Sequence, residues 1–141
     1  MKKDCGMWIN ILSHKLKKRM DADMRNLGIT GVQSRVMHYI FIKYAAGPVF
    51  QRDVENAFGF NRSTATGILQ LMEKNGLILR ESAAGDARLK SLIPTEKAVL
   101  LEEQIDQCLR RTEKCLTRDL SQAQLASFLE TAECMSVNLD G

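Results

Sequence analysis

Five stretches of the chain place apolar residues at three- and four-residue steps, the spacing of one helix face. They predict helices over residues 8–27, 31–44, 61–74, 95–117 and 122–138, and a shorter helix fits 51–58. Local signals support several boundaries. Thr30 with Gln33 and Ser121 with Gln124 form capping-box patterns, and Asn61 is a favourable N-cap.

Two runs in the middle of the chain alternate between apolar and polar residues, the period of a strand. They are "LILRES" at 77–82 and "RLKSLI" at 88–93, and a short Gly-containing loop separates them. The predicted order is therefore α-α-α-α-β-β-α-α, a mainly α fold with one hairpin.

Two of the predicted helices show which side faces the core. In the second helix the expected buried stripe is Val32, Val36, Ile40 and Tyr44. The helix over 61–74 has an apolar face and an opposite face of small and polar residues. The apolar face holds Ala65, Ile68, Leu69 and Met72; the polar face holds Arg62, Ser63, Thr66, Gly67, Gln70 and Lys74.

A short helix, a tight turn and a polar-faced helix are the parts of a helix-turn-helix, and a hairpin directly after them makes a winged helix. The small residues would let the helix backbone approach DNA closely, and the long ones can reach base edges or phosphates. The alternative is an ordinary amphipathic helix with a solvated face. Our expected major-groove residues are Arg62, Ser63, Thr64, Thr66, Gly67 and Gln70, with Lys74 beside them.

Composition narrows the function classes only slightly. The 141 residues carry a net charge of +3, below the strongly basic balance typical of nucleic-acid-binding domains. No apolar run is long enough to cross a membrane and no cleavable leader is evident, so we expect a cytoplasmic protein. The four cysteines form no CxxC pair, and no phosphate-binding, GxSxG or HExxH motif occurs. We therefore expect no enzyme, metal or cofactor.

Residues 47–98 resemble the MarR family of winged-helix regulators, and the outer helices extend the resemblance over nearly the whole chain. The similarity includes "LGIT" at 27–30, "LMEKNGLILR" at 71–80, the Asp-x-Arg of the hairpin and "TEK" at 95–97. It implies that Arg88 enters the DNA minor groove and that Asp86 helps to hold it. A narrow minor groove attracts Arg, and Arg80 and Lys90 on the strands are expected phosphate contacts. The chain departs from the family at Phe50, Pro94 and Ala98, where a hydroxyl residue, Leu and Gly are usual.

The same resemblance implies a single domain over 1–141, with a DNA-binding core at 30–94 and dimerisation helices at 1–29 and 95–141. The alternative is that the outer helices only complete a monomeric core. The implied function is a transcriptional regulator, which we expect to be a repressor acting as a homodimer on a palindromic operator. The rival interpretation is a winged-helix module that binds protein and not DNA.

Two kinds of switch are considered. Members of the family respond to small aromatic ligands, and Trp8, Leu12, Met37, Tyr39 and Tyr44 could line such a pocket, although a cluster of this kind can equally be plain core. Others sense oxidants through a cysteine near the first helix. Cys5 lies in that region and is the candidate, with an inert exposed thiol as the alternative.

Overall fold

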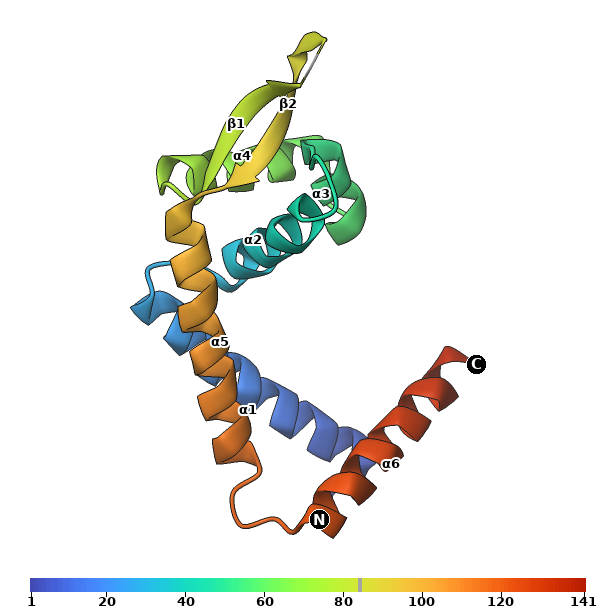
Figure 1. Ribbon diagram of the computed structural model, residues 1–141. Coiled ribbons are helices and arrows are strands. Elements are labelled where there is room, and N and C mark those ends of the chain that lie inside the picture. Colours follow the sequence, from blue (N-terminus) through green and yellow to red (C-terminus); the bar gives the residue numbers. More distant parts are fainter. Residues whose placement is uncertain (84) are drawn as a thin grey trace. The chain divides into compact units, whose positions relative to one another are not determined.

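The structure, a computed structural model, describes residues 1–83 and 85–141, and the side chains of all of these except residue 87. The predicted order of elements is confirmed (Figure 1). The elements are α1 (Cys5–Asn26), α2 (Gly31–Tyr44), α3 (Gln51–Phe58), α4 (Arg62–Lys74), β1 (Ile78–Ala83), β2 (Asp86–Pro94), α5 (Glu96–Leu116) and α6 (Gln122–Asp140). The chain divides into two compact units, 1–108 and 109–141, and the boundary falls within α5.

The predicted helix caps are present. The hydroxyl of Thr30 accepts the backbone N–H of Gln33 at 3.1 Å, and the side chain of Gln33 accepts the N–H of Thr30 at 3.3 Å. Ser121 and Gln124 make the same reciprocal pair before α6. These bonds satisfy N–H groups that a helix cannot satisfy internally, so each helix begins where its cap stands.

The core of the first unit is formed by apolar side chains from α1, α2, α3, α4, the hairpin and α5, together with residues of the connecting segments. Its members include Met24, Val36, Met37, Ile40, Val54, Leu69, Met72, Leu77, Leu92 and Leu101. Burying one side chain of this size stabilises the fold by about 1.5–3 kcal/mol. Because α4 supplies two of these residues, its orientation follows from the core.

The predicted buried stripe of α2 is wrong at its end. Tyr44 is 45% exposed, and the buried residues are instead Gln33, Val36, Met37 and Ile40. Steps of four residues advance about 40° around a helix, so a stripe made only of such steps turns away from the core. Tyr44 is also the last residue of α2, where less of the core remains to cover it.

The hairpin is an antiparallel pair whose register runs from Ile78 opposite Pro94 to Ser82 opposite Lys90. A bulge follows between Ser82 and Ala83. The hairpin is attached to the rest of the unit at its base. There the N–H of Leu92 donates to the carbonyl of Val49 at 2.7 Å.

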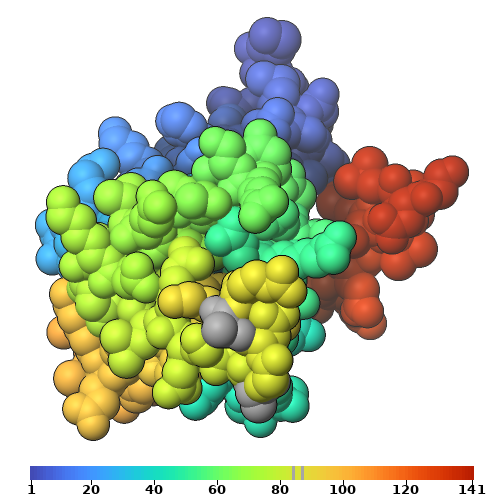
Figure 2. Space-filling view, turned by 90° about the horizontal axis from the view of Figure 1, so that it is seen from above, coloured from blue at the N-terminus to red at the C-terminus, as the bar shows by residue number. Residues whose placement is uncertain are grey.

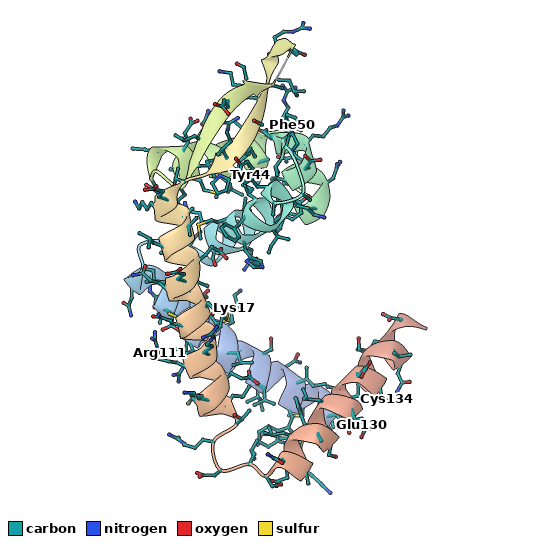
Figure 3. All side chains as sticks on the ribbon, in the orientation of Figure 1. Lys17, Tyr44, Phe50, Arg111, Glu130 and Cys134 are labelled. Carbon is teal, nitrogen blue, oxygen red and sulfur yellow. The ribbon has the colours of Figure 1, made fainter. Side chains whose placement is uncertain are left out.

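The connection between α2 and α3 reaches the hairpin, which the sequence did not predict. Phe50, labelled in Figure 3, forms an isolated antiparallel bridge with Ser91 of β2. Phe50 has no side-chain acceptor to cap α3, but its N–H donates to Asp53 at 2.9 Å. The departure from the usual hydroxyl residue is therefore compatible with an ordered start of α3.

A polar contact links α2 to α5 within the first unit. Nδ1 of His38 lies 2.9 Å from Oε2 of Glu102. Nearby, Ala98 is fully buried, so the position where the family usually has Gly is occupied by a small side chain inside the core. At the start of α5 the Thr95 hydroxyl donates to the carbonyl of Gly76 at 2.6 Å.

The second unit holds the end of α5 and α6. α6, all of whose residues are described, contains no buried side chain. Its apolar face is only partly covered: Leu125, Ala132 and Met135 are half-buried, and Phe128 and Leu129 are 60% and 66% exposed. Over the described part of the chain, no helix is both long enough and apolar enough to span a membrane.

Candidate nucleic-acid interface

The turn between α3 and α4 is built from a glycine and an aromatic cluster. Gly59 ends α3 with φ +68°, a left-handed conformation that side chains other than Gly rarely adopt. Phe58 stacks on Phe60 with ring centroids 5.4 Å apart, and Tyr39 meets Phe58 edge-on at 5.6 Å. These contacts fix the angle at which α4 leaves the turn.

α4 presents two different faces. Ala65, Leu69 and Met72 are fully buried. On the other side, Arg62, Ser63, Thr64, Gly67, Gln70 and Lys74 are all exposed, and Thr66 is half-buried. Asn61 begins the helix by accepting the N–H of Thr64 at 2.8 Å. The helix is therefore held by one face and offers the other to solvent.

A side chain of α3 contacts this exposed face. Nε2 of Gln51 donates to the Thr66 hydroxyl oxygen at 2.9 Å and lies 3.5 Å from the carbonyl oxygen of Arg62. Gln51 is the first residue of α3, at the end of the helix away from the turn, and its side chain reaches the first part of α4 because the two helices pack together. The two helices of the motif are thus joined by polar contacts as well as by the core.

The hairpin tip brings the predicted charge pair together. Oδ1 of Asp86 accepts the backbone N–H of Arg88 at 2.9 Å, and the same oxygen lies 3.6 Å from Nε of Arg88. The Arg88 side chain is 95% exposed. Asp86 therefore shapes the backbone at the tip, and the guanidinium extends into solvent.

A groove of about 810 Å³ separates α3 and α4 from the hairpin. Figure 2 looks down on the hairpin (yellow) and shows the surface of α4 (green) beside it. The groove is lined by Phe50, Gln51, Arg52, Glu55, Arg62, Thr66, Gln70, Glu73, Arg80, Arg88, Leu89 and Lys90. Six predicted DNA contacts therefore share one concave surface, hereafter the α4–wing groove. The other five, Ser63, Thr64, Gly67, Lys74 and Asp86, are outside its lining.

The charge of the groove is locally unbalanced. Five cationic side chains and two acidic ones line it, an excess as large as the net charge of the entire chain. One acidic residue is engaged with a cation: Oε2 of Glu73 lies 3.5 Å from Nε of Arg80. A surface with this excess attracts a polyanion.

Comparison with known proteins shows which family has this arrangement. The model of the MarR family matches residues 27–89. The transcription regulator MarR from Oenococcus oeni PSU-1 is 30% identical over 96% of this chain and 99% of its own, with a TM-score of 0.63.

The chain belongs to the MarR family.

More distant members share the fold. MepR, a transcription regulator of the Staphylococcus aureus multidrug efflux pump MepA, is 21% identical over 97% of this chain and 99% of its own, with a TM-score of 0.87. A complex of S. aureus MepR with DNA is 21% identical over 96% of both chains, with a TM-score of 0.70. A search of curated proteins finds no match to the sequence. The predicted winged-helix architecture and family are thus confirmed.

The residues predicted to line an effector pocket have three different surroundings in this MarR-family protein. Met37 is buried in the core, and Tyr39 is half-buried against Phe58. Trp8, Leu12 and Tyr44 are on the surface, with exposed fractions of 50%, 37% and 45%. A ligand site that used all five would need surfaces beyond the core of one chain.

The cysteines divide by exposure. Cys5, Cys115 and Cys134 are exposed and Cys108 is buried; Figure 3 labels Cys134 on α6. Cys5 is the first residue of α1. Among the side chains that the structure describes, no group of three or more His, Cys, Asp or Glu could hold a metal ion.

Sequence reasoning missed four polar residues that line the groove, namely Gln51, Arg52, Glu55 and Glu73. Three of them are on α3, which was treated only as the first helix of the motif. Gln51 carries no local signal for this position, because it is at the end of α3 opposite the turn that leads to α4. Glu73 carries no such signal, since its contact with Arg80 depends on the position of β1.

Proposed function

We propose that this protein is a sequence-specific double-stranded-DNA-binding regulator that acts as a homodimer on a two-fold symmetric operator. α4 would enter the major groove, and the hairpin would follow the DNA backbone so that Arg88 reaches the adjacent minor groove. The expected DNA contacts are those in the α4–wing groove together with Ser63, Thr64, Gly67 and Lys74. Asp86 would position Arg88.

The observation that carries this proposal is the charge of the α4–wing groove. A groove with five cations and two carboxylates beside an exposed polar helix face suits a phosphate backbone with base edges next to it. MepR, which has the same fold, has been solved in complex with DNA, and this supports DNA as the partner. A winged helix that bound protein through this face would need an apolar centre, and the groove is lined mainly by charged and polar groups.

Dimerisation is proposed from the apolar surface that the outer helices expose. Trp8, Ile9 and Leu12 on α1 and Phe128 and Leu129 on α6 all have exposed fractions between 37% and 66%. Exposed apolar patches on helices mark association sites more often than isolated exposed residues do. In this proposal residues 30–94 bind DNA, and 1–29 and 95–141 join the two subunits.

We further propose that the dimer represses transcription and is released by a small aromatic ligand or by oxidation of Cys5. An operator that overlaps a promoter would exclude the polymerase while the dimer occupies it. A ligand would act by preferring a dimer whose two α4 helices are wrongly spaced for the operator. If Cys5→Ser lost operator affinity in peroxide as fully as the native protein does, the oxidation route would be excluded.

The experiment that tests DNA binding is a gel shift with the protein's own promoter DNA and a scrambled duplex, across salt concentrations. We expect promoter binding that weakens steeply as salt rises, because neutralised phosphates release their counterions. Absence of binding to the promoter at low salt would contradict the proposal and favour the protein-binding alternative.

Arg88→Ala tests the hairpin. The variant should lose about tenfold in affinity, since a base-edge or groove contact of this kind contributes about 1–3 kcal/mol. The loss should be larger on AT-rich flanking sequence, where the minor groove is narrow. An equal loss on GC-rich flanks would show that Arg88 contacts only the backbone.

A further inference from the structure

The contact between Gln51 and Thr66 bears on which hydrogen-bonding group the middle of α4 can offer to DNA. This inference rests on the proposed DNA-binding function. A threonine hydroxyl can donate one hydrogen bond and accept two, so an isolated Thr reads acceptors and donors alike. Thr66 is not isolated, because Nε2 of Gln51 donates to its oxygen at 2.9 Å.

The orientation of the Gln51 amide follows from its contact with a second group, the backbone carbonyl of Arg62. The same Nε2 lies 3.5 Å from the carbonyl oxygen of Arg62. A carbonyl oxygen only accepts, so it faces the amide nitrogen and not the amide oxygen. The nitrogen therefore also faces Thr66, and the Thr66 oxygen is the acceptor in that bond.

Few hydrogen-bond acceptors within the protein then remain for the hydroxyl hydrogen of Thr66. In a helix a threonine commonly donates back to the carbonyl four residues earlier, which here is that of Arg62. That carbonyl has two lone pairs. One receives the helical N–H of Thr66 and the other faces the Gln51 amide. The remaining direction is outward, into the α4–wing groove that Thr66 lines.

We propose that Gln51 is a positioning residue: it occupies one of the two lone pairs of the Thr66 oxygen, turns the hydroxyl hydrogen toward the groove, and thereby favours a base with an acceptor at one operator position. Guanine, adenine and thymine each present an acceptor in the major groove. Cytosine presents only its N4 amino donor. The base facing Thr66 is therefore one with an acceptor edge, and cytosine at that position is disfavoured.

Gln51→Glu reverses the polarity of the pair. A carboxylate only accepts, so Thr66 would donate to Glu at position 51 and leave its oxygen as an acceptor toward DNA. The added charge lowers affinity for every sequence alike. The informative quantity is therefore the ratio of affinities between two duplexes that differ at one base pair.

The experiment selects bound duplexes from a pool in which each promoter position is randomised in turn, with the full-length native protein and with Gln51→Glu. In the native protein we expect one position at which cytosine binds about tenfold more weakly than the preferred base, within the usual range for a single mismatch. In Gln51→Glu the discrimination against cytosine at that position should disappear or reverse, and the preferences at other positions should stay.

Three companion variants separate positioning from fold. Thr66→Ser keeps the hydroxyl and should keep the native preference. Thr66→Val should lose it, and adding Gln51→Glu to Thr66→Val should then change no preference, as a double-mutant cycle requires. Equal circular dichroism spectra and thermal midpoints would show that each variant is folded.

The outcomes are distinct. If the native protein selects no sequence, the proposed function fails and this inference fails with it. If the native protein selects a sequence but Gln51→Glu weakens all duplexes equally, the function stands and the role of Gln51 is overturned. The same holds if Gln51→Glu changes preference in the Thr66→Val background.

Discussion

α4 and α6 are capped in the same way at their N-termini, but they differ in how much of each helix is buried. Each is opened by a side chain that accepts the N–H of its third residue, from Asn61 and from Ser121. α4 then buries three side chains completely, and α6 buries none of its residues, all of which are described. The comparison shows that amphipathic sequence alone does not reveal what a helix packs against. In α4 the free face is polar, and in α6 it is apolar.

The functional consequence differs accordingly. The exposed residues of α4 are suited to a hydrated, charged surface such as DNA, because their hydrogen-bonding groups remain available. The exposed Phe128 and Leu129 of α6 offer mainly apolar surface, and burying that surface away from water lowers the free energy. In our proposal the first surface binds DNA and the second binds a second copy of the chain.

Truncation of a core residue should have the largest effect. Leu69 on α4 is fully buried, and Leu69→Ala should lower the free energy of unfolding by about 2–5 kcal/mol because it leaves a cavity. Leu71→Ala is the matched control on the same helix, since Leu71 is 53% exposed, and it should cost far less. Urea denaturation followed by circular dichroism measures both. Equal losses would mean that α4 is not anchored by one face.

A charge on the apolar face of α6 should have the next largest effect. Phe128→Glu would place a carboxylate in the proposed subunit interface and should convert the dimer to a monomer, because burying an unpaired charge is costly. Sedimentation velocity measures the mass. Ser127→Glu adds the same charge at an exposed polar position of α6 and should leave the dimer intact. A native protein that sediments as a monomer at micromolar concentration would remove the basis for this assignment.

The smallest effect is expected on the free face of α4. Glu73 holds Arg80 within the groove at 3.5 Å. Glu73→Gln should raise DNA affinity severalfold at low salt, because it removes a negative charge near the phosphates and frees Arg80 to contact one. Glu81→Gln is the control, since Glu81 is exposed, is on the same strand as Arg80, and is outside the groove lining. Fluorescence anisotropy would measure both. A weaker Glu73→Gln complex would show that the pair positions Arg80 for binding.

Local signals explain how much of the fold could be predicted. The Thr30 and Ser121 caps, the glycine after α3 and the alternating strands act over a few residues, so their patterns can be read along the chain. The end of α2 was misjudged at Tyr44, since a helix face can be predicted from spacing but the extent of the core beneath it cannot.

The site was predictable only where its residues are consecutive or periodic. Arg62, Thr66 and Gln70 recur on one helix face, and Asp86 and Arg88 lie within one turn. Gln51 is 15 residues from Thr66, and His38 is 64 residues from Glu102. Such contacts depend on the packing of separate elements, which no local pattern encodes. The neutralising effect of Glu73 within a basic groove was missed for the same reason.

Hydroxyl-radical footprinting of the native protein on its own promoter tests the central claim most directly. A homodimer that places α4 in two major grooves and Arg88 in the flanking minor grooves should protect two symmetric half-sites, with centres about one helical turn, roughly 10 base pairs, apart. Further protection should appear in the minor groove outside each half-site, and Arg88→Ala should remove only that outer protection. A single unsymmetric footprint, or no protection under conditions where the protein is folded, would contradict the account.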